Sequence, residues 1–131
     1  MLPLDYSILL VEDFESLMIV QTGILNELGY DSIQTATNGV EAWAKLEELF
    51  QTNNEIKCIV SDWNMPEMDG LELLKRVRAD ERFKKLPFFM LTSETGKKDI
   101  LSAIESGVTN YVVKPATFDV LEDKFKRYKN E

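Results

Sequence analysis

Short apolar runs and amphipathic segments alternate along the chain in a regular order. Five apolar runs have the length of a strand and are rich in Ile, Val, Leu, Phe or Tyr: residues 7–11, 32–36, 57–61, 88–91 and 110–113. The segments after them carry apolar residues at three-to-four spacing, which predicts helices near residues 17–28, 40–50, 70–79, 97–106 and 118–128. Gly29 directly follows the first of these segments and supplies a helix stop.

This alternation predicts an α/β architecture. Strands that alternate with helices are joined by right-handed crossovers, so they form a parallel sheet with helices on both faces. The runs at residues 8–11 and 56–60 are the most apolar and should be the central strands. Because no linker, repeat or low-complexity segment interrupts the pattern, we expect a single doubly wound (βα)5 domain over residues 1–131, without an output domain.

Composition narrows the chemistry that this domain can perform. The chain has 131 residues, with 23 acidic and 15 basic side chains, one cysteine and no histidine. Its net charge of −8 disfavours nucleic acid as a direct partner, because that binding needs clustered positive charge. The absence of histidine excludes catalytic triads, imidazole zinc sites and a phosphohistidine within this chain. Since Cys58 is alone and residues 8–11 are far short of a membrane span, we expect a soluble cytoplasmic protein.

Side chains that could perform chemistry follow four of the five predicted strands. In chain order they are Glu12 and Asp13, then Asp62, then Thr92, and finally Lys114. The carboxyl ends of parallel strands meet at one edge of the sheet, which is where ligands bind in open α/β folds. Each residue alone is an ordinary loop or capping residue, but their joint placement predicts a functional site.

Three carboxylates, a hydroxyl and an ammonium group at one edge are suited to phosphoryl transfer. The carboxylates repel each other, and a hard divalent ion that prefers oxygen ligands, Mg²⁺, would offset their charge. The paired Glu12 and Asp13 suit the metal, while the isolated Asp62 is the natural nucleophile toward phosphorus. Phosphoryl transfer mainly needs positioning and charge stabilisation, which the metal, Lys114 and Thr92 can supply.

These residues, in this order, resemble the signature of response-regulator receiver domains. The resemblance extends over essentially the whole chain and is carried by the run Ser61-Asp-Trp-Asn-Met-Pro-Glu-Met-Asp-Gly70, by Val112-Val-Lys-Pro115, and by Phe14 after the acid pair. It is strongest to the stand-alone chemotaxis receivers of the CheY type. It implies a five-stranded parallel sheet with the strand order 2-1-3-4-5 and five helices.

The resemblance assigns the central role to Asp62. It implies that Asp62 accepts a phosphoryl group from a phosphohistidine on a partner kinase, which accounts for the missing histidine. The implied Mg²⁺ ligands are Glu12, Asp13, Asp62 and the backbone carbonyl of Asn64.

Further roles follow from the same resemblance. Lys114 and Thr92 would contact the phosphoryl group, and the Lys114–Pro115 peptide bond is expected to be cis. Asn64 and Glu94 occupy the positions that tune the lifetime of the phosphoryl group in the family.

The implied output is a conformational switch. Phosphorylation would draw Thr92 toward the new oxygens and let Tyr111 turn inward, which changes the face of the fourth helix, fifth strand and fifth helix. Candidate partner contacts on that face are Lys97, Lys98, Ile100, Tyr111, Lys124 and Arg127. The implied partners are a histidine kinase of the CheA type, a FliM-like flagellar motor switch protein and a phosphatase. The chain would be a monomeric regulator that catalyses only its own phosphorylation and dephosphorylation, rather than an enzyme.

Two positions depart from the family pattern. Ser93 stands where Ala is usual, and its hydroxyl could alter the turn. Ala116 stands where Phe usually follows Lys-Pro, which would remove a large apolar group beside the output face. These departures affect the expected partner more than the expected chemistry.

Three alternatives share parts of this pattern. A single-domain receiver can also act as a phosphate sink or as a phosphorelay intermediate for another output. A Mg²⁺-dependent phosphohydrolase with an Asp nucleophile would need a second Asp two residues later, where Asn64 stands. A flavin-binding module is disfavoured, because the six glycines never adopt the G-x-G-x-x-G spacing and no other phosphate-binding loop is recognisable.

Overall fold

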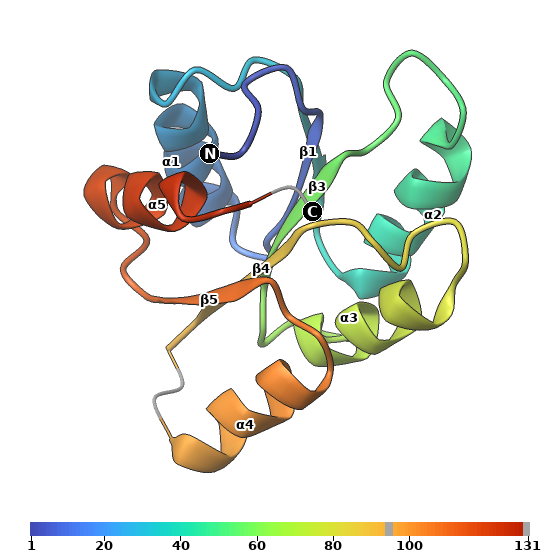
Figure 1. Cartoon of the computed structure of the whole chain (residues 1–131), viewed down its shortest axis with the longest axis vertical. Helices are drawn as coiled ribbons and strands as arrows, with labels where there is room; N and C mark the ends of the chain where they lie inside the picture. The colour runs from blue at the N-terminus through green and yellow to red at the C-terminus, as the bar shows by residue number, and fades with distance from the viewer. Residues whose placement is uncertain (94–95, 130–131) are drawn as a thin grey trace.

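Five strands alternate with five helices in the computed structural model, which describes residues 1–93 and 96–129 (Figure 1). The strands are β1 (Ile8–Val11), β2 (Ile33–Ala36), β3 (Cys58–Asp62), β4 (Phe88–Thr92) and β5 (Asn110–Val113). The helices are α1 (Glu15–Glu27), α2 (Gly39–Leu49), α3 (Gly70–Ala79), α4 (Lys97–Glu105) and α5 (Phe118–Lys126). Within the described residues, no helix is long and apolar enough to cross a membrane.

The strands form one parallel sheet in the order β2-β1-β3-β4-β5. Helices α1 and α5 lie on one face of the sheet, and α2, α3 and α4 lie on the other (Figure 1). All residues of β1, β3 and β4 are buried, because these strands have neighbours on both sides and helices on both faces. The predicted doubly wound fold and its strand order are confirmed. The two runs predicted to be central, β1 and β3, are interior strands, and β4 is a third interior strand.

Alternate residues of each strand pack into two separate cores. Leu9 and Val11 of β1 face α2 and α3, whereas Ile8 and Leu10 face α1 and α5. This alternation is the ordinary consequence of the two-residue repeat of a strand. Both faces therefore need apolar residues, which explains why the central strands are continuous apolar runs.

The start of the chain is attached to the side of the molecule formed by α1 and α5. The side chain of Leu2 is fully buried there, and its backbone N–H donates to the Phe125 carbonyl at 2.9 Å. The Tyr30 hydroxyl donates to the Leu2 carbonyl at 2.7 Å. The first residues thus connect the end of α5 to the loop that follows α1.

Element boundaries differ from the predicted ones by at most two residues. The most useful difference is at β3, which runs to Asp62 instead of stopping at residue 61. Asp62 pairs with Leu91 of β4 and is the last residue of the strand. Its backbone is therefore held by the sheet, while its side chain points beyond the sheet edge.

Helix starts near this edge are set by capping side chains. Asn38 accepts a hydrogen bond from the Glu41 backbone N–H, and Asp69 accepts one from the Glu72 N–H, both at 2.9 Å. These bonds satisfy N–H groups that the first turn of a helix leaves unpaired. They fix where the loops after β2 and β3 end.

Gly70, at the start of α3, allows the helix to pack directly behind Asp62. A Cβ atom at this position would overlap the Asp62 carbonyl oxygen and would lie 2.8 Å from the Met90 sulfur. The Gly70 N–H also donates to the Trp63 carbonyl at 2.8 Å. A side chain here could not be accommodated without moving the end of β3.

We expect Gly70→Ala to lower the free energy of unfolding by about 1–3 kcal/mol, because the added methyl group overpacks a backbone contact. Gly23→Ala is the matched control, since nothing lies within 4 Å of a Cβ at Gly23 in α1. That substitution should stabilise the protein by about 0.5–1 kcal/mol. Urea unfolding of both variants measures the effects, and equal stabilisation by the two would show that Gly70 is not sterically required.

Candidate functional site

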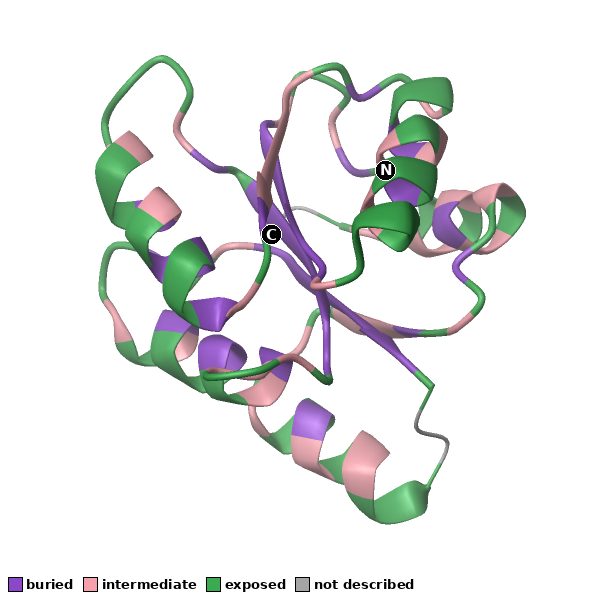
Figure 2. Ribbon diagram, turned by 180° about the vertical axis from the view of Figure 1, so that it is seen from behind, coloured by how far each residue is buried: buried purple, intermediate pink, exposed green. Residues whose placement is uncertain are grey.

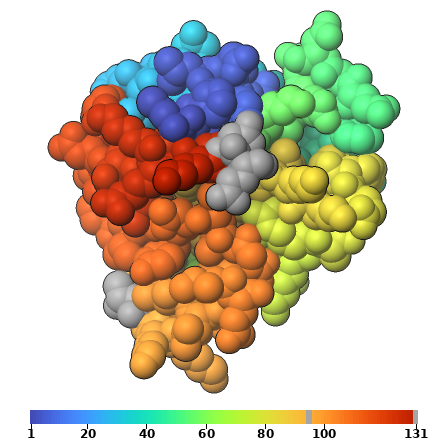
Figure 3. Space-filling model, viewed as in Figure 1, coloured from blue at the N-terminus to red at the C-terminus, as the bar shows by residue number. Residues whose placement is uncertain are grey.

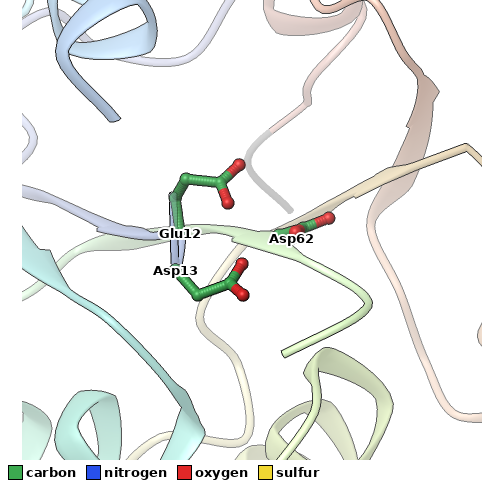
Figure 4. A group of neighbouring side chains, drawn as sticks. All are labelled: Glu12, Asp13 and Asp62. Carbon is green, nitrogen blue, oxygen red and sulfur yellow. The ribbon is translucent and has the colours of Figure 1, made fainter. Parts of the chain in front are cut away.

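Parallel pairing of β1 and β3 places the three predicted acidic residues together. Val11 at the end of β1 is aligned with Ser61 of β3, so Glu12 and Asp13 emerge beside Asp62. One carboxylate oxygen from each of the three residues lies within 4.8 Å of the other two. Figure 4 shows the carboxylates of Glu12 and Asp13 extending toward the side on which Asp62 lies. The predicted acidic cluster is therefore present.

Backbone amides hold two of these carboxylates in place. Glu12 is completely buried, and its Oε2 accepts a hydrogen bond from the Phe14 N–H at 3.2 Å. Asp62 is only 5% exposed, and its Oδ1 accepts one from the Trp63 N–H at 2.9 Å. Both donors belong to the backbone just after the acid, so no side-chain motif in the sequence reveals them.

Lys114 supplies the cation of the site. It follows β5 and reaches past β4, so that its Nζ lies 3.0 Å from Asp62 Oδ1 and 3.5 Å from Glu12 Oε1. The peptide bond from Lys114 to Pro115 is cis, as predicted. One ammonium group thus bridges acids from two strands.

Burial and neighbouring charges shift the pKa values of Glu12 and Lys114. Burial raises the pKa of Glu12, and the nearby Asp62 carboxylate adds to the effect. The Phe14 N–H and the Lys114 ammonium oppose this rise only in part. Burial lowers the pKa of Lys114, but the hydrogen bond and charge of Asp62, together with Glu12, outweigh burial and leave that pKa raised. Lys114 therefore stays charged, and one positive charge faces three acids.

The donor set is suited to a divalent cation. Asp13 Oδ1 is buried and has no hydrogen-bond partner among the described residues. A buried carboxylate oxygen without a partner is costly unless a cation or water completes it. With Glu12 and Asp62 it offers three oxygen ligands of the kind that Mg²⁺ prefers. The residues present thus fit the Mg²⁺ predicted from the sequence.

The remaining predicted residues lie around this cluster. Thr92 ends β4 and is 1% exposed, whereas Asn64 and Ser93 are exposed in the loops after β3 and β4. Tyr111 in β5 is half-buried, and the Lys124 ammonium lies 5.5 Å from the centre of its ring. Glu94 lies outside the described residues.

The residues predicted to contact partners lie on and beside the two helices next to β5. Lys97, Lys98 and Ile100 are in the first turn of α4, and Lys124 is in α5. Arg127 caps the end of α5, where its Nε pairs with Asp123 at 3.1 Å. These positions are compatible with the predicted face of α4, β5 and α5.

Ala116 occupies a buried position in the loop that precedes α5. It is 9% exposed and packs in the core between the sheet and helices α1 and α5, with Leu121 and Phe125. It also lines a hollow beside α1. Two of these neighbours, Leu121 and Phe125, belong to α5, so the expectation that Ala116 lies beside the output face stays a prediction.

Comparison with known proteins identifies the family. The response regulator receiver domain model matches residues 8–126 of the chain. The chain belongs to this family. The receiver is 44% identical over 119 residues to the chemotaxis protein CheY1 of Helicobacter pylori (strain J99), covering 91% of this chain and 93% of that protein. It is 41% identical to a CheY homologue of Campylobacter jejuni, covering 91% and 88%. It is therefore a receiver of the CheY chemotaxis type.

Solved structures agree with this assignment. The receiver superposes on the chemotaxis response regulator CheY4 of Vibrio cholerae with a TM-score of 0.82 and 32% identity, covering 94% of this chain and 98% of that one. It matches the receiver domain of sensor histidine kinase PA1611 from Pseudomonas aeruginosa with a TM-score of 0.80 and 26% identity, covering 95% and 97%. That structure has a magnesium ion coordinated in the active site cleft.

We expect Mg²⁺ to stabilise the receiver, and Asp13→Asn to remove most of that effect. Without metal, Asp13→Asn should raise the free energy of unfolding by roughly 1–3 kcal/mol, the scale for removing one like charge about 5 Å away near a protein surface. Urea unfolding in EDTA and in excess Mg²⁺ measures both effects. Asp5→Asn, at an exposed position, should respond to Mg²⁺ as the unaltered receiver does. If the unaltered receiver gains no stability from Mg²⁺, the metal assignment is wrong.

Proposed function

We propose that this receiver is a phosphorylation-dependent switch of chemotaxis signalling, with Asp62 as the phosphoacceptor. The observation that carries the proposal is the environment of the Asp62 carboxylate. Asp62 is nearly buried, bonded to Lys114 at 3.0 Å and placed beside the acids at positions 12 and 13 on the neighbouring strand. An aspartate held in this way has a cation to balance its charge and a neighbouring pair of acids to bind a metal.

The phosphoryl transfer in this proposal is a direct displacement. Trp63 N–H and Lys114 both bond to Asp62 Oδ1, so Oδ2 is the oxygen that attacks phosphorus. A new O–P bond forms as the N–P bond of the kinase phosphohistidine breaks, and the imidazole nitrogen keeps that electron pair. The product is an aspartyl phosphate on Asp62.

Each side chain at the edge has a distinct task in this proposal. Glu12, Asp13, Asp62 and the Asn64 carbonyl would hold Mg²⁺, which would offset negative charge on the phosphoryl oxygens. Lys114, which contacts Asp62 and Glu12, exchanges one of these contacts for a phosphoryl oxygen and so stabilises its negative charge. The Thr92 hydroxyl, at the end of the neighbouring strand, binds another of these oxygens. Asn64 and Glu94 set how long the phosphoryl group lasts.

The output in this proposal is a changed surface of α4, β5 and α5. Movement of Thr92 toward the phosphoryl group gives Tyr111 space to turn inward from its half-buried position. The negative charge of the phosphoryl group thus shifts the surface of α4, β5 and α5 from one conformation toward another. The kinase partner is of the CheA type and the target is a FliM-like motor switch protein, which is consistent with the chemotaxis proteins that the receiver resembles.

Incubation with acetyl phosphate and Mg²⁺ tests the phosphoacceptor. We expect the mass of one added phosphoryl group, together with a change in the fluorescence of Trp63, which is buried next to Asp62. Asp62→Asn should abolish both signals, and EDTA should suppress them. Glu67→Gln is the matched control, because Glu67 is exposed in the same loop. An adduct that persists in Asp62→Asn would contradict the proposal.

Affinity for the N-terminal peptide of a motor switch protein tests the output. Phosphorylation should tighten binding by roughly 5–100-fold, the usual range for coupling between two sites. Lys97→Ala on α4 should weaken this binding, whereas Lys75→Ala on the exposed side of α3 should leave it unchanged. Isothermal titration calorimetry measures each affinity. Equal affinity before and after phosphorylation would contradict motor control and favour a phosphate sink or a phosphorelay intermediate.

A further inference from the structure

Helix α4 is the least buried helix of the receiver. Figure 3 shows it, in orange, projecting at the edge of the molecule. Of its nine residues Ala103 alone is buried, whereas each of the other helices has at least two buried residues. Leu101 and Ile104 are exposed, and Figure 2 shows exposed or half-buried residues along most of the helix. A helix with so little buried surface depends on other contacts for its position.

The hydrogen bonds that attach α4 to other elements lie beyond its last residue. In the described part of the chain, residues 96–105 form hydrogen bonds only with each other and with residues 106–108. Just after them, the Thr109 N–H donates to the Phe88 carbonyl and the Thr109 hydroxyl oxygen accepts from the Phe88 N–H, both at 2.9 Å. The start of α4 lacks a capping side chain, because its N-cap residue is Gly96.

Arg78, on α3, joins the end of α4 to the loop before β4. Its Nε donates to the Gly107 carbonyl at 2.8 Å, and its Nη1 donates to the carbonyls of Leu86 at 2.7 Å and Lys84 at 3.1 Å. Arginine is suited to this task, because its donors lie in a rigid, planar fork. Arg78 forms no ion pair with any residue that the structure describes. Its hydrogen bonds are therefore all with backbone carbonyls of two loops.

The backbone of Gly107 lies directly against the Arg78 side chain. Its φ angle is +92°, the left-handed conformation in which helices commonly end at a glycine. A Cβ atom at this position would lie 3.2 Å from Arg78 Nε and 3.3 Å from its Cδ. A larger residue would strain the backbone and displace the guanidinium group. The glycine thus ends the helix and also permits the close approach of Arg78.

We propose that Arg78 is a positioning residue that makes the Gly107 end of α4 a fixed pivot. The inference rests on the proposed function, in which Thr92 moves toward a phosphoryl group on Asp62. Thr92 comes shortly before α4 in the chain, so its movement reaches the helix at the start. Because Arg78 holds the other end, the helix tilts about its last residues instead of shifting as a whole. A nine-residue helix is about 13 Å long, so a tilt of about 10° moves its start by roughly 2 Å.

Distances between pairs of spin labels test the pivot. One label is placed on a reference helix, at Glu48→Cys in α2 or Asp119→Cys in α5. The other is placed at Lys98→Cys near the start of α4 or at Glu105→Cys at its end, and the native Cys58 is fully buried. We expect phosphorylation with acetyl phosphate to change the distances to position 98 by roughly 2 Å and those to position 105 by much less. Equal changes at both positions would mean a shift of the whole helix and would overturn the pivot.

Arg78→Met removes the three hydrogen bonds and keeps a long side chain. It should broaden the distances to position 105 even without phosphorylation. It should also lower the ratio of motor-switch peptide affinities after and before phosphorylation by roughly 2–30-fold, the range for substitutions that alter coupling between two sites. Arg76→Met is the control, because Arg76 is exposed on the same helix and lies over the Trp43 ring instead of Gly107. It should leave both measurements unchanged.

Gly107→Ala and Gly29→Ala separate the pivot from a general loss of stability. Gly29 follows α1 with a φ of +107°, and a Cβ there would lie 3.2 Å from the Leu4 side chain. Both substitutions should lower the midpoint of urea unfolding, because each forces a side chain into a left-handed conformation. Gly107→Ala alone should broaden the distances to position 105 and lower the affinity ratio. It also tests the pivot if Arg78→Met does not fold.

Two further results would overturn the role of Arg78. Narrow distances to position 105 and an unaltered affinity ratio in Arg78→Met would mean that its hydrogen bonds are only structural. Equal effects of Gly29→Ala and Gly107→Ala on the affinity ratio would mean that the switch responds to overall stability. Failure of acetyl phosphate to label Asp62 would overturn the phosphorylation-driven tilt together with the proposed function. The distances in the unphosphorylated receiver would still decide whether Arg78 fixes the end of α4, so the two failures are distinguishable.

Discussion

The bridge that Lys114 makes between Asp62 and Glu12 is the interaction on which the working edge of this receiver depends. Parallel pairing of β1 and β3 brings acids from the ends of two strands together, with one oxygen of each within 4.8 Å of the others. Like charges at this spacing are unfavourable unless a cation lies between them. Lys114 provides that cation from a third strand, at 3.0 Å and 3.5 Å from the two acids. The sheet is thus held together at this edge by side chains as well as by its hydrogen bonds.

Lys114 neutralises only part of the negative charge of the acidic cluster, which leaves the cluster suited to bind a further cation. One ammonium group offsets one of three carboxylates, and Asp13 retains a buried oxygen without a partner among the described residues. Burial raises the pKa of Glu12 in the same setting. A site arranged in this way is less stable than a neutral one, and a divalent cation removes the deficit. The acidic cluster that can bind a cation therefore lowers the stability of the metal-free receiver. Such a trade-off between stability and binding is common at preformed ligand sites.

The fold and the residues of the acidic cluster could both be predicted from the sequence. Apolar runs with strand length, separated by amphipathic segments, leave few topologies other than a doubly wound sheet. Acids after the first and third runs meet because those strands are neighbours, in the strand order that the family resemblance implies. The backbone donors from Phe14 and Trp63 could not be predicted, because any residue has an N–H group. The buried neighbours of Ala116 could not be predicted either, since they depend on how the loop after β5 packs against α1 and α5 and not on local pattern.

The buried start of the chain has a consequence for signalling. Leu2 is bonded to the carbonyl of Phe125 and to the hydroxyl of Tyr30, so the last turn of α5 is held by residues from the opposite end of the sequence. The same turn carries Lys124, whose ammonium lies over Tyr111. The first few residues therefore hold one border of the proposed output surface, away from the acidic cluster. Under the proposed function, a change in that segment would alter the surface offered to a partner without touching Asp62 or the residues around it.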